Sequence, residues 1–129
     1  MMKSPGHREH PGHAVIETPV GHQVRASIDG QVVAQSDHVI RVDEDDAPPR
    51  FYFPRASVKV DKLELSDTKT TCPFKGEASY YNVTHKGRQL KDAIWSYEEP
   101  YDEHAALKDR MAFDDEKYSG ITFSEVRPR

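Results

Sequence analysis

Apolar and polar residues alternate with a period of two from residue 13 onward, in short stretches separated by turn residues. This spacing is typical of β-strands with one buried face. Between two such stretches, Asp29-Gly30 predicts a two-residue type I′ hairpin turn, because both central residues of that turn need a positive φ. A second turn is predicted at HKGR, residues 85–88, between the two longest stretches. We expect strands within residues 13–19, 23–28, 32–34, 38–42, 51–53, 58–65, 78–84, 89–97, 111–113 and 121–126.

One segment has helical features, EEPYDEHAALKDR at residues 98–110. A proline near its start, acidic residues early and basic residues late match the polarity of the helix dipole. The expected fold class is therefore mainly β: a small antiparallel β-barrel or two packed sheets, with one short helix near the C-terminus. A chain of 129 residues is long enough for one domain with its own core.

The first twelve residues, MMKSPGHREHPG, contain two Pro-Gly pairs and show no apolar periodicity. Such a composition favours disorder. We therefore expect a disordered N-terminal arm at residues 1–12 and a single β domain at residues 13–129. His7, His10 and His13 are spaced three apart, which raises the question of a metal site. Pro11 and Gly12 interrupt the helix that would align these rings, so we expect solvated histidines and no metal.

The charge balance limits the partners that the chain can have. Its formal net charge is -4, its pI is near 5.9, and its basic residues are scattered. Nucleic acids and anionic membranes require a cationic face, so we expect neither as a partner. A single cysteine excludes an internal disulfide and a cysteine-built zinc site. No apolar stretch is long enough to span a membrane, and a signal-peptide core is lacking. We expect a cytoplasmic protein without a cofactor, and a homodimer remains open.

The stretch TTCPFKGEASYYNV, residues 71–84, contains the only cysteine and has three interpretations. In the first, Pro73 and Gly76 form a tight turn that opens a strand, and Cys72 is a small buried residue. In the second, the ammonium of Lys75 favours the thiolate of Cys72, so Cys72 and Lys75 are the catalytic candidates. In the third, Lys75 binds an anion at the mouth of a pocket.

Arg55 follows FYFP directly and would supply a second cation for such a pocket. Its planar guanidinium suits a carboxylate or a phosphate. Aromatic residues on nearby strands would form the walls. The expected ligand is a small anionic molecule, and the expected ligand-binding residues are Tyr52, Arg55, Cys72, Lys75, Trp95 and Tyr97.

Three blocks of the chain resemble the signature blocks of domain-of-unknown-function family 427 (DUF427): YFPRASV at 52–58, TTCPFKGEASYYNV at 71–84 and AIWSYEEPY at 93–101. The resemblance implies a compact, mostly antiparallel fold that is β-tent-like. It does not imply the zinc that β-tent domains often hold between cysteine pairs, because this chain has one cysteine. Asp114 stands where many members have a tyrosine. The recurrent family positions correspond here to Asp43, Arg55, Thr71, Cys72, Lys75, Gly76, Trp95, Tyr97 and Pro100.

Three functions are compatible with these residues. The first is binding of a small anionic ligand, with catalysis unproven. The second is nucleotidyl transfer, because the family is sometimes given a nucleotidyltransferase-like label. That chemistry needs carboxylates that hold magnesium and a loop that cradles phosphates, and DEDD at 43–46 is the one acidic cluster. The third is a non-catalytic protein-interaction module.

Overall fold

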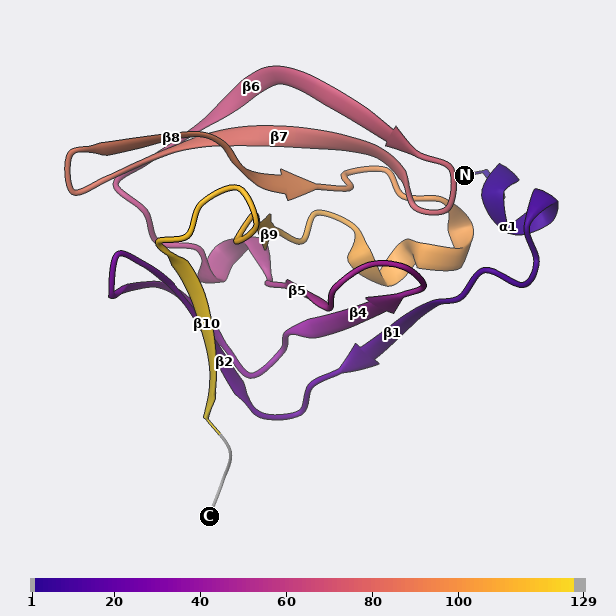
Figure 1. The fold of residues 1–129 in the computed structure, drawn as a ribbon, viewed down its shortest axis with the longest axis horizontal. Helices are drawn as coiled ribbons and strands as arrows, with labels where there is room; N and C mark the ends of the chain where they lie inside the picture. Colours follow the sequence, from indigo (N-terminus) through magenta and orange to yellow (C-terminus); the bar gives the residue numbers. More distant parts are fainter. Residues whose placement is uncertain (1, 127–129) are drawn as a thin grey trace.

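The computed structural model describes residues 2–126, whose strands form three antiparallel sheets (Figure 1). The strand orders are β1-β4-β5, β10-β2-β3 and β6-β7-β8-β9. The predicted mainly β fold of packed antiparallel sheets is thus confirmed, with three sheets and, among the described residues, no closed barrel. The bounds are β1 Val15–Pro19, β2 Gln23–Ile28, β3 Gln31–Ser36, β4 Ile40–Glu44, β5 Arg50–Tyr52, β6 Lys62–Cys72, β7 Gly76–His85, β8 Arg88–Ser96, β9 Ala112–Phe113 and β10 Ile121–Val126.

Both predicted hairpin turns are present. Asp29 and Gly30 join β2 to β3 with φ of 51° and 84°, as a type I′ turn requires. Lys86 and Gly87 join β7 to β8 with φ of 50° and 79°. Each turn therefore fixes the register of its hairpin, and the register decides which side chains of β7 and β8 share a face.

In Figure 1 the four-stranded sheet lies above the other two sheets, and the buried side chains form two clusters. Alternate residues of a strand face opposite sides, so β7 contributes to two clusters of buried side chains. Tyr81 and Val83 belong to the larger cluster, together with β2 and β3 residues. Ala78 belongs to the smaller cluster, whose other buried members are Ile40, Val42, Tyr52, Tyr97, Leu107 and Ala112. The smaller cluster supports the site described below.

Helical structure is confined to short segments: α1 Pro5–Glu9 and the 3-10 helices η1 Arg55–Ser57 and η2 Asp102–Leu107. The segment 98–110, for which the sequence predicts a helix, thus contains only the 3-10 helix η2. His104 and Leu107 are its buried residues, and their spacing of three suits the three-residue turn of a 3-10 helix. None of the described helices is long and apolar enough to cross a membrane.

The N-terminal segment differs from the disordered arm expected at residues 1–12. The structure describes residues 2–12 and packs them beside η2 and the β6–β7 turn. Ser4 caps α1 through a hydrogen bond from the His7 N–H to its hydroxyl, and Pro5 occupies the first helical turn. A Ser-Pro pair is a recognised helix start. Apolar periodicity misses it because a five-residue helix has no room for a repeat.

Candidate functional site

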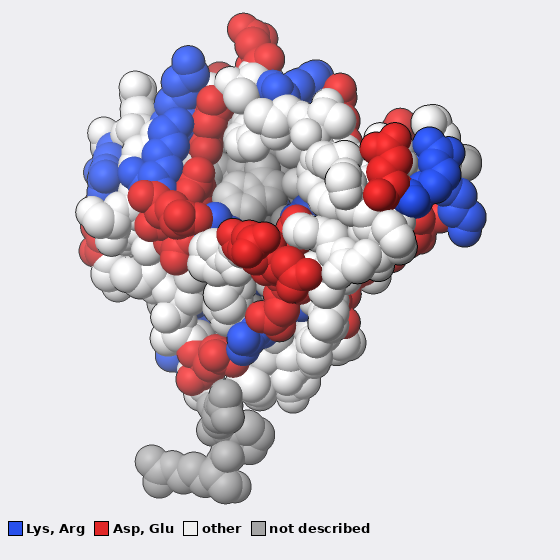
Figure 2. All heavy atoms as spheres, turned by 45° about the vertical axis from the view of Figure 1, so that its right-hand side comes forward, with Lys and Arg blue, Asp and Glu red and all other residues white. Residues whose placement is uncertain are grey.

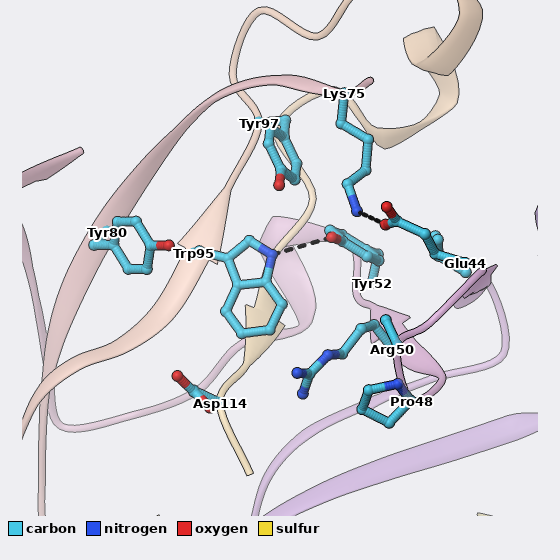
Figure 3. Close-up of a pocket in the computed structure, with 11 residues that line it drawn as sticks. Glu44, Pro48, Arg50, Tyr52, Lys75, Tyr80, Trp95, Tyr97 and Asp114 are labelled. Atoms are coloured by element: carbon cyan, nitrogen blue, oxygen red, sulfur yellow. Dashed lines mark hydrogen bonds and ion pairs between the residues drawn. The ribbon is translucent and has the colours of Figure 1, made fainter. Parts of the chain in front are cut away.

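A cavity of about 300 Å³ lies between the β4–β5 hairpin and strands β7 and β8 (Figure 3). Its volume is at the lower end of the range of ligand pockets, ~300–1,000 Å³. The register pairs Tyr80 of β7 with Trp95 of β8, so both rings lie on the same face of the sheet. The lining residues are Val42, Glu44, Ala47, Pro48, Arg50, Tyr52, Lys75, Tyr80, Trp95, Tyr97 and Asp114.

Lys75 and Glu44 form a largely buried ion pair in this lining. Lys75 Nζ lies 2.6 Å from Glu44 Oε1, and the two side chains are 10% and 18% exposed. Burial alone would raise the pKa of Glu44, but hydrogen bonds from Lys75 and His13 outweigh burial and hold this pKa below its usual range. Burial likewise opposes the charge of Lys75, yet the pKa of Lys75 is raised, because the hydrogen bond and the negative charge of Glu44 favour the ammonium. Both groups are therefore ionised at neutral pH.

Aromatic side chains form the walls next to this pair (Figure 3). The Trp95 indole N–H donates to the Tyr52 hydroxyl over 3.0 Å. The Tyr97 ring lies 6.3 Å from the Tyr52 ring and 5.8 Å from Lys75 Nζ. Burial raises the pKa of both Tyr52 and Tyr97, so both hydroxyls keep their protons.

The donors of this site outnumber the acceptors that they meet. An ammonium has three N–H groups, and Lys75 uses one for Glu44. Tyr52 accepts the hydrogen bond of Trp95 and keeps its own O–H to donate. The Tyr97 side chain also lines the cavity, and burial keeps its hydroxyl protonated. The lining thus presents several donors to whatever occupies the cavity.

Arg50 adds a second cation that sequence reasoning missed. Its guanidinium lies over the Trp95 ring, 5.2 Å from the ring centroid. It also pairs with Asp115 at 3.1 Å and with Glu116, which connects β5 to the loop after β9. Arg50 therefore packs against the indole, below it in the view of Figure 3. Its positive charge is neutralised by Asp115 and Glu116.

Glu44 is another cavity residue that sequence reasoning missed, and the sequence did contain a signal for it. Ile40, Val42 and Glu44 alternate along β4, and the structure buries the first two in the smaller core cluster. A carboxylate in register with two buried apolar residues must face the same side. Such a group needs a buried partner, and Lys75 supplies it.

Four of the six predicted ligand-binding residues line the cavity: Tyr52, Lys75, Trp95 and Tyr97. Cys72, at the end of β6, packs against the smaller core cluster and is not in the lining. It is half-buried and a free thiol. The turn that follows it needs a glycine, because Gly76 has a φ of 126° and a Cβ there would lie 3.3 Å from the Glu99 carbonyl oxygen.

Arg55 lies outside the cavity, which corrects the expectation that it shares a pocket with Lys75. Its guanidinium donates to the Tyr81 hydroxyl at 3.2 Å, to Ser96 Oγ at 3.1 Å and to Glu98 at 3.0 Å. Ser96 follows Trp95 on β8, so the two side chains point to opposite faces of the sheet. The guanidinium of Arg55 therefore binds groups on the face that the cavity does not use.

The described residues form a small three-sheet β domain with a cavity that is lined in part by aromatic side chains. Residues 17–124 match the model of the family described as domain of unknown function DUF427. This match covers most of the chain, so the chain belongs to the DUF427 family, and the resemblance seen in the three sequence blocks is confirmed. The search of curated proteins found no match.

Proposed function

We propose that this domain binds a small, flat molecule that carries a carboxylate or a similar anionic acceptor group. The observation that supports the proposal is the surplus of donors in the cavity: the N–H groups of Lys75 and the hydroxyls of Tyr52 and Tyr97. Hydrogen bonds from an ammonium to an anion are among the stronger ones in proteins. The acceptor group of the ligand would lie at these donors.

The remainder of the ligand would contact the aromatic walls. Trp95 and Tyr80 stand side by side on one sheet face, and Arg50 backs the indole. Flat apolar surface packs well against such rings. Asp114 lies on the side of the indole away from Lys75 (Figure 3). Its negative charge would repel a second anionic group of the ligand.

Attraction of the anion would be local, because the protein surface is not cationic. Figure 2 shows acidic side chains spread across the middle of one face, with Lys and Arg in separate patches. The net charge of -4 agrees with that distribution. Salt screens the attraction between charges over about 10 Å at moderate ionic strength. A ligand would therefore be attracted by Lys75 only after it enters the cavity.

In this role Lys75 is a donor and not a nucleophile. A lysine attacks a carbonyl only as the neutral amine, and its ion pair with Glu44 raises the pKa of Lys75. Nucleotidyl transfer gains no support either: within residues 2–126, no three His, Cys, Asp or Glu side chains gather as metal ligands would.

The test is a fluorescence titration, because Trp95 is the only tryptophan and lines the cavity. The probes are benzoate, benzamide and benzylammonium, which share a ring and differ in charge. We expect benzoate to bind more tightly than benzamide, and benzylammonium to bind most weakly. Loss of one charged hydrogen bond costs about 1.5–3 kcal/mol, so Lys75→Met should weaken benzoate binding about 10- to 100-fold.

The matched control is Lys69→Met. Lys69 is half-exposed, bonds to Ser79 and Glu77, and does not line the cavity, so its replacement should leave benzoate affinity unchanged. Equal binding of benzylammonium and benzoate would refute the proposal. So would a Lys75→Met variant that binds benzoate as the parent does, or no response to any of the three probes.

A further inference from the structure

Residues 2–13, called the strap from here on, precede the family match at 17–124 and lie against the loop that carries Lys75. The Gly6 N–H donates to the Pro73 carbonyl oxygen over 2.8 Å, and the Ser4 hydroxyl donates to the same oxygen over 2.8 Å. The Ser4 N–H donates to the Glu103 carboxylate of η2. The strap thus binds both the β6–β7 turn and η2.

The contact at Gly6 tolerates no side chain. A Cβ at this position would lie 2.7 Å from the Pro73 carbonyl oxygen and 2.8 Å from a ring carbon of Phe74. Gly12, in the same strap, has nothing within 4 Å of its Cβ position. These two glycines give a matched pair of sites at which the same added methyl group either blocks docking or does not.

Two histidines of the strap hold Phe74, the residue before Lys75. The His13 ring stacks on Phe74 with centroids 4.2 Å apart, and the His7 ring meets Phe74 edge-on at 5.0 Å. His13 also reaches the cavity pair, because its Nε2 lies 3.0 Å from Glu44 Oε2. The strap therefore contacts Glu44 directly and also contacts Phe74, the residue next to Lys75.

His7 and His104 form a contact that survives one added proton but not two. Their Nε2 atoms lie 2.7 Å apart, so one must carry the hydrogen and the other must accept it. His104 Nδ1 lies 2.8 Å from Glu17 Oε1, which fixes Nδ1 as the donor to that carboxylate. When both rings are protonated, both Nε2 atoms are donors and the hydrogen bond between them is lost.

The surroundings of His7 oppose its protonation while the strap is docked. Burial lowers the pKa of His7, and the neighbouring His104 lowers it further, while the opposing effect of Glu103 is smaller. The released strap would recover the ordinary histidine pKa of about 6.5, so the released state binds a proton more readily. Docking is therefore strongest above about pH 6.5 and weakens as pH falls below it. The charged and titratable groups that face this contact are His104 and Glu103 of η2, His13 of the strap, Glu44 of β4 and Glu17 of β1.

We infer that the strap is a pH-sensitive clasp that positions the Lys75–Glu44 pair: docked, it holds Phe74 and the second oxygen of Glu44, and mild acid releases it. The control of ligand binding that follows rests on the proposed function. The docking itself does not, and it is measured without any ligand.

The first experiment compares Gly6→Ala with Gly12→Ala by amide hydrogen exchange and by carboxyl NMR titration of Glu44. Alanine has a higher helix propensity than glycine, so Gly6→Ala should not destabilise α1 itself. We expect Gly6→Ala to lose protection of the residue-6 amide and to raise the pKa of Glu44, which loses its His13 partner. Gly12→Ala should resemble the parent in both. Equal protection in the two variants would refute the docking, and an unchanged Glu44 titration in a released strap would refute the link to the pocket.

The second experiment follows the residue-6 amide at pH 7.5 and pH 5.5 (about one unit on each side of the ordinary histidine pKa), corrected for intrinsic exchange. Protection should fall at the lower pH, by up to about tenfold for each unit by which docking lowers the pKa of His7. Glutamine can donate to His104 without titrating, so His7→Gln should keep its protection at both pH values. His10 is exposed, and its ring centroid lies 6.4 Å from that of Phe74, farther than those of His7 and His13, so His10→Gln should behave as the parent. Protection that does not change with pH in the parent, or a His7→Gln variant that loses protection as the parent does, would overturn the pH-sensitive clasp.

Discussion

Replacing Lys75 with methionine keeps most of the side-chain volume but removes the charge that Glu44 faces. Breaking a buried ion pair by removing one partner costs about 3–5 kcal/mol. Glu44 is 18% exposed and keeps its bond to His13, so we expect the lower end, about 3 kcal/mol. For a chain of 129 residues, this corresponds to a fall in Tm of about 10 °C.

The assay is urea unfolding at pH 7.5 (about three units above the ordinary glutamate pKa), followed by Trp95 fluorescence and circular dichroism. Glu44→Gln in the Lys75→Met background should restore most of the loss, because it removes the unpaired charge. A loss of about 1 kcal/mol or less, as for an exposed pair and no larger than that of Lys69→Met, would refute the claim that the pair is buried and coupled.

The pH dependence of this variant gives a second check on the same pair. In the parent, Lys75 and His13 hold the pKa of Glu44 below its usual range. Its contribution to stability is therefore present above the ordinary glutamate pKa of about 4.3 and is lost as pH falls through the lowered value. Without Lys75 the pKa of Glu44 should rise, so the destabilisation of Lys75→Met should be largest at neutral pH and should shrink in acid.

Three further predictions concern other residues of the site and its neighbours. Tyr52→Phe leaves the Trp95 indole N–H without its acceptor and should cost about 1–3 kcal/mol in urea unfolding, with little change in the far-UV spectrum. Arg55→Gln should lower the free energy of unfolding by no more than about 1 kcal/mol, because the side chains of Arg55 and Glu98 are 36% and 39% exposed. It should leave benzoate affinity unchanged, and a tenfold loss of affinity would contradict the placement of Arg55 outside the cavity. Cys72→Ser should also retain benzoate affinity in the Trp95 titration, because Cys72 does not line the cavity, and a marked loss would contradict that placement.

Local patterns predicted the strands and turns well, because each depends on a few adjacent residues. The residue types of Asp29-Gly30 and of the turn after β7 predict both turns, and the positive φ angles agree. The alternation that identified β7 and β8 also placed Trp95 and Tyr97 in a buried region. The proline and the glycine that frame Lys75 mark it as a site candidate in the sequence, and Lys75 lies in the cavity.

The remaining features depend on packing between distant segments. The position of Arg55 after FYFP predicts a place in the pocket, but the face of β8 that this turn meets depends on tertiary packing, and Arg55 meets Ser96 on the other face. Arg50 reaches Trp95 only because β5 lies opposite β8 across the cavity. The docking of residues 2–12 depends on contacts between segments that are far apart in the sequence. Ser4 binds Pro73, 69 residues away, and Glu103, 99 residues away.

The most direct measurement is a crystal structure of the protein soaked with para-bromobenzoate, with the bromine located by its anomalous signal. We expect one bromine site in the cavity between β5 and β8, with the carboxylate within hydrogen-bond distance, about 2.7–3.2 Å, of Lys75 Nζ and the ring against Trp95. The same soak of Lys75→Met should give weak or no signal there. A bromine bound outside this cavity, or a ligand whose carboxylate points away from Lys75 toward solvent, would contradict the proposed binding mode.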